Sequence, residues 1–135
     1  MKRKHNLIFI SLLFVLTSTS LFACSKNSNS SPSFITINAT EAKELMDSTD
    51  GYVILDVRTP DEYEAFHIEN AILISDYEIM EKAEGILKDK DQVIFVYCRS
   101  GRRSKNAAKD LVKLGYKNVI DFGGINSWPY GVVTE

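Results

Sequence analysis

One cysteine in this sequence stands where it could act as a nucleophile. The six residues after Cys98 include one glycine and three arginines. The amide N–H groups of a short, glycine-containing loop can converge on an anion, and a helix that follows adds the positive end of its dipole. Together with the guanidinium groups, they favour thiolate over thiol and predict a nucleophile near neutral pH. The residues of this predicted active-site loop are Cys98, Arg99, Ser100, Gly101, Arg102, Arg103 and Ser104.

A structural interpretation of the same residues is possible. Cys98 could be a buried residue at the end of a strand, with the arginines forming the solvated start of a helix. The helix dipole disfavours cations at a helix N-terminus, so three arginines there require a reason. A bound anion or a thiolate supplies that reason, and we therefore favour the catalytic interpretation.

The elements around the loop predict an α/β domain. Residues 92–97 form an apolar run typical of a strand covered on both faces, and residues 104–114 have the apolar face of a helix that ends at Gly115. Alternation of strands and helices predicts a mainly parallel sheet, with ligands bound beyond the carboxyl ends of its strands, where Cys98 lies. The other predicted elements are strands over 34–37, 52–57, 71–75 and 118–122 and helices over 40–46, 59–66 and 76–90.

The first residues have the layout of a secretory signal peptide. A basic start is followed by a ten-residue apolar run, Leu7 to Leu16, that is too short to span a bilayer comfortably. The ending Leu21-Phe22-Ala23-Cys24 resembles a bacterial lipobox, in which the cysteine is acylated and becomes the new N-terminus. We therefore expect a signal peptide over 1–24, a flexible Ser/Asn linker over 25–33 and a folded domain over 34–135. Plain secretion and an uncleaved N-terminal anchor are the alternatives.

Composition restricts the partners and raises the importance of Cys98. The hydrophobic content of 44% and charged content of 25% are ordinary for a globular protein. All 18 acidic residues but only 13 of the 16 basic ones lie beyond residue 25, and this acidic body argues against nucleic acid binding. If Cys24 is acylated, Cys98 has no intrachain partner in an oxidising compartment, so its thiol must be either buried or used.

Three ordered motifs resemble the rhodanese family over residues 34–133. The resemblance implies an open sheet of about five mainly parallel strands flanked by helices on both faces. The implied activity is transfer of sulfane sulfur from a small anionic donor such as thiosulfate, through a Cys98 persulfide, to cyanide or a thiol, without a metal or organic cofactor. The motifs are Leu55–Arg58 with Glu62, Tyr63, His67, Ile68 and Ala71; Tyr97–Ser104 as the active-site loop; and Gly123–Ile125 with Trp128.

The resemblance also assigns supporting roles and shows two departures. Asp56 and Arg58 are expected to form ion pairs or hydrogen bonds that orient the loop, and His67 to be a structural hydrogen-bonding group. Phe66 and Asn70 stand where the family usually has glycine. Trp128 either forms a wall of the pocket or fills core.

Two other functions use the same residues. A cysteine phosphatase or arsenate reductase needs Cys-x5-Arg, whereas here Ser104 occupies the arginine position and the shorter loop suits a single sulfur atom. A non-catalytic rhodanese-like module that binds a partner or carries sulfur is the other alternative. We expect an exported monomer, lipid-anchored on the extracytoplasmic side of the bacterial cell envelope.

Overall fold

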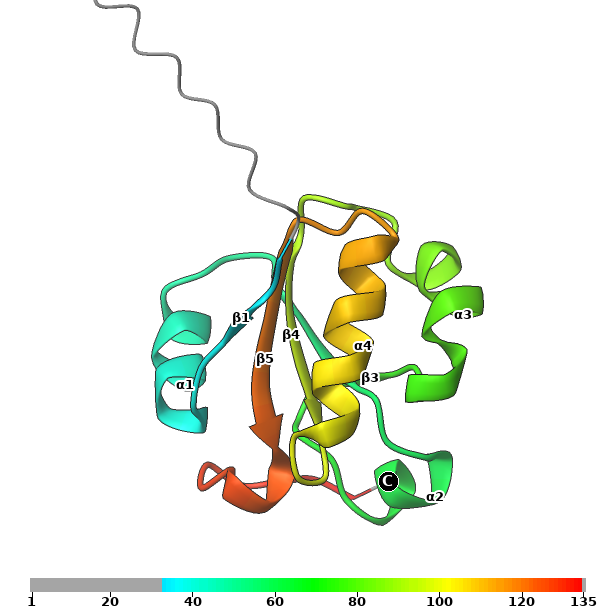
Figure 1. Cartoon of the computed structure of the whole chain (residues 1–135). Coiled ribbons are helices and arrows are strands. Elements are labelled where there is room, and N and C mark those ends of the chain that lie inside the picture. The colour runs from blue at the N-terminus through cyan, green and yellow to red at the C-terminus, as the bar shows by residue number, and fades with distance from the viewer. Residues whose placement is uncertain (1–32, 135) are drawn as a thin grey trace, which may run out of the picture.

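The computed structural model describes residues 33–134 as an α/β domain (Figure 1). The predicted signal peptide, the acylation candidate Cys24 and nearly all of the predicted linker lie outside the described residues. Within residues 33–134, no helix is both long and apolar enough to cross a bilayer.

Five parallel strands form one sheet in the order β1-β5-β4-β2-β3. Figure 1 shows α1 on one face of this sheet and α3 and α4 on the other. The predicted fold class is therefore confirmed. The strands are β1 (Ile35–Thr36), β2 (Val53–Asp56), β3 (Ile72–Leu73), β4 (Val93–Cys98) and β5 (Asn118–Gly124). The helices are α1 (Ala39–Asp47), α2 (Pro60–Ala65), α3 (Ile79–Ile86) and α4 (Arg102–Lys113), with short 3-10 turns η1 (Asp76–Glu78) and η2 (Ile125–Ser127).

The central strand β4 is apolar throughout because helices cover both of its faces. Ile94, Val96 and Cys98 belong to the core that α3 and α4 bury. Phe95 and Tyr97 belong to the core on the α1 side. Successive side chains of a strand point to opposite faces, so this alternation places the Cys98 side chain on the α4 side of the sheet.

Local signals in the sequence set the helix ends. Asn38 caps α1, and its side chain and that of Glu41 form a reciprocal capping box. Thr59 caps α2 in the same way, with Pro60 in the first turn. At the end of α4, Gly115 has a φ of 91°, a left-handed conformation that closes the helix as predicted.

The predicted helix over 76–90 was too long. Its first three residues form the 3-10 turn η1, and α3 ends at Ile86. Leu87 leaves the helical conformation with its side chain buried, and its carbonyl oxygen accepts a hydrogen bond of 2.7 Å from the Tyr116 hydroxyl. This long-range contact ends the helix, whereas the prediction used only the local apolar pattern.

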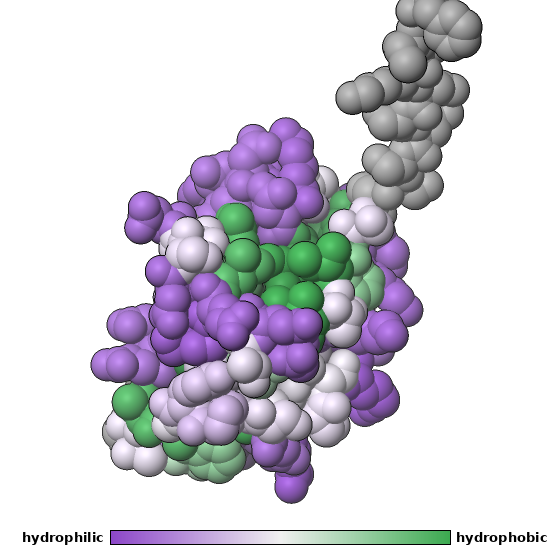
Figure 2. Space-filling view, turned by 90° about the vertical axis from the view of Figure 1, so that its left-hand side faces the viewer, coloured by the Kyte–Doolittle hydropathy of each residue, from purple (hydrophilic) through white to green (hydrophobic). Residues whose placement is uncertain are grey.

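The first described residues lie at the end of the sheet opposite to Cys98. The strands are parallel, so the amino ends of β1, β4 and β5 lie at one end of the sheet and the carboxyl end of β4 lies at the opposite end. The side of the molecule that carries α1 has an apolar patch near the first described residues (Figure 2). Ile35 and Leu45 are exposed. Both line a groove of about 230 Å³, and Ser33 and Ile120 are among the other residues that line it.

Gly124 allows strand β5 to pass close to the predicted active-site loop. Its backbone is paired with that of Cys98. A Cβ atom at Gly124 would lie 2.4 Å from the Arg99 carbonyl oxygen and 2.6 Å from Ser100 Cα, both backbone atoms that cannot swing away. The loop can take its observed place only because this side chain is absent.

Replacing Gly124 with alanine should therefore displace the loop and destabilise the domain by about 1 to 3 kcal/mol, as overpacking does. Gly85→Ala is the matched control, because Gly85 is helical and a Cβ there would meet nothing within 4 Å. That control should gain up to about 1 kcal/mol. Urea unfolding measures both changes, and a Gly124→Ala protein as stable as wild type would contradict the packing described.

Candidate active site

The Cys98 sulfur lies at the bottom of a tight loop between β4 and α4. Cys98 is the last residue of β4 and its side chain is fully buried. The Gly101 amide donates a hydrogen bond of 3.0 Å to Sγ. Gly101 has a φ of 100°, which glycine adopts without steric cost, and α4 begins at the next residue. The helix thus starts two residues earlier than predicted, and its N-terminus lies next to the sulfur.

The loop lowers the pKa of the Cys98 thiol although the side chain is buried. Burial alone would raise this pKa, but hydrogen bonds from the Ser104 amide and hydroxyl and from the amides of Gly101 and Ser100 outweigh burial. The net shift is downward, so a larger fraction of Cys98 is thiolate at neutral pH than in free cysteine. The amides are fixed donors, while the Ser104 hydroxyl has a single hydrogen to share.

A buried carboxylate holds that hydroxyl. Asp121 Oδ1 lies 2.7 Å from Ser104 Oγ and accepts a second hydrogen bond of 3.1 Å from the Gly123 amide. Asp121 is almost fully buried in β5, and no cation pairs with it among residues 33–134. It therefore connects the start of α4 to the end of β5 beneath the loop. Asp121 was not among the predicted site residues, and its only signal in the sequence is an acidic residue within an apolar strand.

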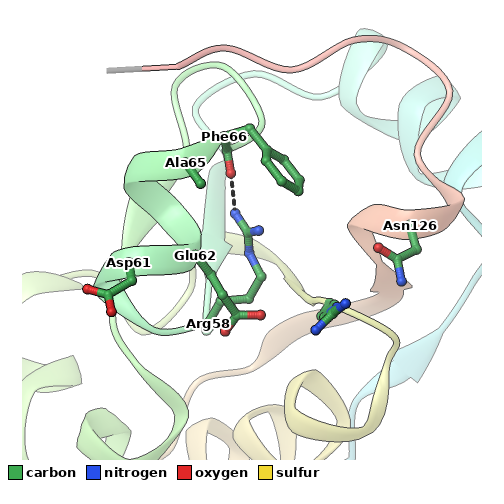
Figure 3. Close-up of a pocket in the computed structure, with 7 residues that line it drawn as sticks. Arg58, Asp61, Glu62, Ala65, Phe66 and Asn126 are labelled. Atoms are coloured by element: carbon green, nitrogen blue, oxygen red, sulfur yellow. Dashed lines mark hydrogen bonds between the residues drawn. The ribbon is translucent and has the colours of Figure 1, made fainter.

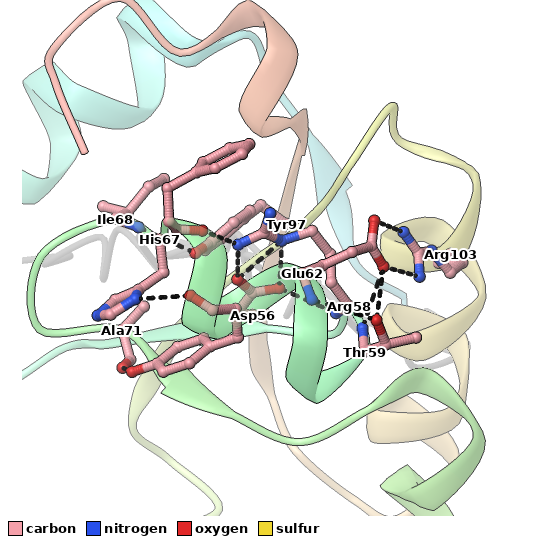
Figure 4. Close-up of polar contacts among 11 residues, drawn as sticks. Asp56, Arg58, Thr59, Glu62, His67, Ile68, Ala71, Tyr97 and Arg103 are labelled. Carbon is pink, nitrogen blue, oxygen red and sulfur yellow. Dashed lines mark hydrogen bonds and ion pairs between the residues drawn. The ribbon is translucent and has the colours of Figure 1, made fainter. Parts of the chain in front are cut away.

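Arg103 is held by a partner that the sequence analysis did not assign. Its guanidinium donates hydrogen bonds of 2.7 and 2.8 Å to the two carboxylate oxygens of Glu62 (Figure 4). Chiefly through this pair, and despite the opposing effect of burial, the pKa of Glu62 falls to about 2. Glu62 also accepts hydrogen bonds from Thr59, so the first turn of α2 is fastened to the first turn of α4.

The other two arginines of the loop are free of such partners. Arg99 is exposed and lines a pocket beside the loop. Arg102 is exposed on the first turn of α4. Neither forms an ion pair with any residue between 33 and 134. Of the three arginines predicted to supply positive charge, two are therefore available to a ligand and the third is committed to Glu62.

Asp56 and Arg58 form the ion pair expected of them, fully buried at the end of β2. Arg58 Nη2 lies 2.6 Å from Asp56 Oδ2 and also donates to the carbonyl oxygen of Phe66 at 2.6 Å (Figure 4). The guanidinium lies 5.6 Å from the ring centre of Tyr97, the residue before Cys98, whose hydroxyl accepts a hydrogen bond from the Ile68 amide. The pair thus supports the chain next to the loop, through its contacts with Phe66 and Tyr97.

His67 has structural partners. Its Nδ1 lies 3.0 Å from the Tyr63 carbonyl oxygen, and its ring stacks on the Tyr63 ring at 3.8 Å. Its backbone pairs with Val133. Trp128 packs against Phe122 at the border of the core, as the second of its two expected roles requires. The surface cavity that it lines is a different one from the pocket beside Arg99.

The two positions that depart from the family's glycines adopt conformations suited to their residues. Phe66 is extended, with a φ of −172°, a backbone that any residue adopts. Asn70 has a φ of 63°, and asparagine enters this left-handed region more readily than other residues with a side chain. Neither departure therefore disturbs the path of the chain.

A pocket of about 300 Å³ opens beside the loop, between α2 and the turn η2 (Figure 3). The loop and this turn are joined by a hydrogen bond of 3.3 Å from the Asn126 amide to the Arg99 carbonyl oxygen. Within residues 33–134, no cluster of three His, Cys, Asp or Glu side chains could hold a metal ion. The residues that line the pocket are Arg58, Asp61, Glu62, Ala65, Phe66, Arg99 and Asn126.

Comparisons with known proteins agree with this geometry. A family model described as "Rhodanese-like domain" matches residues 38–129. The chain is 40% identical over 93 residues to "Thiosulfate sulfurtransferase GlpE" of Coxiella burnetii, a match that covers 68% of this chain and 84% of that protein. It is 38% identical over 105 residues to "Putative sulfur carrier protein YrkF" of Bacillus subtilis, covering 77% of this chain and 54% of that protein. The solved structure "rhodanese with anions from E. coli" is similar with a TM-score of 0.59 and 32% identity, covering 63% of this chain and all of that one.

The lowered thiol pKa predicts the pH dependence of alkylation. Only the thiolate reacts with iodoacetamide, so the rate at Cys98 should reach half its maximum at a pH below about 8.5, the ordinary value for cysteine. Ser104→Ala leaves the amides in place and removes a hydroxyl whose single hydrogen is shared with Asp121, so its midpoint should rise by no more than about one unit. The rates should be measured on the Cys24→Ser protein, in which Cys98 is the one cysteine that can be alkylated. A midpoint at or above 8.5 would contradict the electrostatics of the loop.

Proposed function

This chain belongs to the rhodanese-like domain family, and we propose that it is a sulfurtransferase that carries sulfane sulfur on Cys98. The observation that carries the proposal is a buried sulfur that accepts the Gly101 amide hydrogen in a loop that lowers its pKa. A relative that bears the name thiosulfate sulfurtransferase matches two thirds of the chain at 40% identity. We propose thiosulfate as the donor, cyanide or a thiol as the acceptor, and a monomer as the active form.

The proposed reaction has two steps. The Cys98 thiolate attacks the outer sulfur of thiosulfate, a sulfur–sulfur bond forms, and the bond within thiosulfate breaks with its electron pair leaving on sulfite. An acceptor thiolate then attacks the outer sulfur of the Cys98 persulfide, and the electron pair of the broken bond returns to Cys98. Splitting one transfer into two displacements is the advantage of covalent catalysis.

The loop supports both displacements. The amides that lower the thiol pKa are fixed around Sγ before the reaction begins, so they stabilise the thiolate that attacks in the first step and leaves in the second. Arg99 and Arg102 add positive charge that attracts an anionic donor. The short loop suits one added sulfur atom. Arg103, the arginine that stands one place before the position a cysteine phosphatase requires, is committed to Glu62.

A sulfur carrier without turnover is the second candidate, and one relative supports it. YrkF is named a putative sulfur carrier protein, and it matches 77% of this chain. Both candidates load sulfur on Cys98 and differ only in whether small acceptors discharge it repeatedly. Steady-state formation of thiocyanate from thiosulfate and cyanide separates them.

We further propose that the protein is exported and anchored to the bacterial cell envelope by acylation of Cys24. Support comes from the basic start, the ten-residue apolar run and the Leu-x-Ala-Cys ending, followed by residues with no apolar side chain to bury. The domain would then act on the extracytoplasmic side, joined to the membrane by residues 25–33.

Persulfide formation is the direct test of the sulfurtransferase proposal. Wild-type protein treated with thiosulfate and then freed of it should gain about 32 Da, one sulfur atom, because Cys98 forms a covalent intermediate. Cys98→Ser should gain nothing, and Cys24→Ser should gain the same mass as wild type. Intact-mass spectrometry measures the change, and 3-mercaptopyruvate should load the protein more slowly than thiosulfate. Absence of the added mass on wild type would refute the proposal.

Acylation of Cys24 predicts how the protein divides between phases. Expressed in a bacterium with the full chain, wild type should partition into the detergent phase of Triton X-114, because acyl chains anchor proteins to apolar phases. Cys24→Ser should move to the aqueous phase, while Cys98→Ser should behave as wild type. Equal partitioning of wild type and Cys24→Ser would show that Cys24 carries no lipid.

A further inference from the structure

The buried carboxylate beneath the active-site loop has no cation to neutralise it within the described residues. Asp121 is 2% exposed, and its side chain contacts only the Ser104 and Thr36 hydroxyls and the Gly123 amide in this part of the chain. Burying a charge without an opposite charge is costly. The carboxylate at this position therefore requires a reason.

Asp121 and Cys98 face the same helix from neighbouring strands. Asp121 in β5 pairs with Val96 in β4, two residues before Cys98. Val96 and Cys98 belong to the core that α4 covers, and α4 packs against both strands (Figure 1). Because the Asp121 carboxylate reaches Ser104 in the first turn of α4, it lies on the same side of the sheet as the sulfur.

The Ser104 hydroxyl connects the two groups and has one hydrogen to donate. Its Oγ lies 2.7 Å from Asp121 Oδ1, and 3.1 and 3.2 Å from the carbonyl oxygens of Gly101 and Gly123. The same hydroxyl is within hydrogen-bonding reach of Cys98, where its hydrogen would lower the thiol pKa. A carboxylate is a stronger acceptor than a carbonyl oxygen. Asp121 and the Cys98 thiolate therefore compete for this hydrogen.

Holding the loop in place would not require the charge. Asp121 Oδ1 accepts the Gly123 amide hydrogen at 3.1 Å, at the point where Gly123 has a φ of 89° and β5 shifts its register against β4. Asp121 Oδ2 lies 3.5 Å from the Thr36 hydroxyl. Asparagine has the same shape, its Oδ1 can accept both hydrogen bonds, and its amide can donate to Thr36. The carboxylate differs from asparagine in its charge, and hence in how strongly it holds the Ser104 hydrogen.

We propose that Asp121 is a positioning residue that draws the Ser104 hydrogen away from Cys98 and thereby keeps the thiolate a strong nucleophile. The reactivity of a thiolate falls as the pKa of its thiol falls, whereas a thiolate of lower pKa leaves faster. Asp121 therefore favours the attack of Cys98 on the donor over the departure of Cys98 from the persulfide. This assignment rests on the proposed sulfurtransferase function and adds a residue to its machinery.

The other charges near the loop are not bound to Asp121. None of them forms a hydrogen bond or ion pair with its carboxylate, and β1 contributes only the uncharged Thr36. A change at Asp121 therefore leaves their pairs intact. These charged groups are Arg99 of the loop, Arg102 and Arg103 of α4, Glu62 of α2, Asp76 of η1 and the Asp56–Arg58 pair at the end of β2.

Asp121→Asn separates the charge from the shape. In the Cys24→Ser protein, this substitution should lower the midpoint of Cys98 alkylation by about one unit, because the neutral amide releases the Ser104 hydrogen to the sulfur. The fall should be largely lost when Ser104→Ala is also present, since no hydrogen is then available. Asp110→Asn, which removes a carboxylate paired with Lys113 farther along α4, is the matched control and should leave the midpoint unchanged.

Loading and discharge should change in opposite directions. At a pH of about 9.5, one unit above the ordinary cysteine value, nearly all of Cys98 is thiolate in both proteins. Asp121→Asn should then gain sulfur from thiosulfate about threefold more slowly, the factor expected for a pKa lower by one unit. Its loaded form should transfer sulfur to cyanide faster than wild type, because Cys98 leaves more readily. Intact mass follows both steps, and damage to the loop would instead slow both.

Several outcomes would overturn the proposal. They are an unchanged midpoint in a folded Asp121→Asn protein, an equal fall in the Ser104→Ala background, and slowing of both steps. If Asp121→Asn does not fold, Ser104→Ala alone decides. A midpoint within about half a unit of wild type supports the proposal, and a rise of a full unit shows that the sulfur holds the hydrogen. Protein that never gains sulfur overturns the proposed function, while the alkylation midpoint still decides whether Asp121 holds the hydrogen.

Discussion

The active-site loop depends on lowering the pKa of a buried thiol. Burial of Cys98 disfavours the thiolate, and hydrogen bonds from the loop amides and the Ser104 hydroxyl outweigh that effect. The amides can be so placed because Gly101 turns the chain with a positive φ and because Gly124 leaves room for the loop against β5. The fold places the other parts of the loop: β4 ends at Cys98, and α4 begins directly after the turn at Gly101.

Around this sulfur, fixed ion pairs shape the site. The Asp56–Arg58 pair lies beside Tyr97, and the Glu62–Arg103 pair spans 41 residues to join α2 to α4. A partly buried, bidentate pair holds its geometry better than a single exposed contact. The site therefore presents few mobile charges, and selectivity toward small molecules passes to the few side chains that remain unpaired. Rigidity of the loop and selectivity of the pocket thus have separate structural origins.

Local patterns in the sequence were enough to predict the α/β fold, the strand before Cys98 and the glycine-closed helix after it. The Asp56–Arg58 pair also followed, from the family resemblance. Contacts between segments far apart in the chain could not be predicted this way. The Glu62–Arg103 and Ser104–Asp121 contacts exist because strand order places β2 and β5 on either side of β4. The early end of α3 likewise depends on Tyr116, 29 residues beyond Leu87.

The parallel arrangement of the strands has a directional consequence. The first described residues lie where the strands begin, and the Cys98 sulfur lies where they end. The six-residue strand β4 separates these two ends of the sheet by about 20 Å. A support attached ahead of residue 33 would therefore be joined to the domain at the end opposite to Cys98. Solutes diffusing from the bulk would reach the sulfur without approaching the support, whereas a donor fixed in the plane of the support would meet it only when the domain turns over. Such an orientation favours partners that travel over those that stay in place.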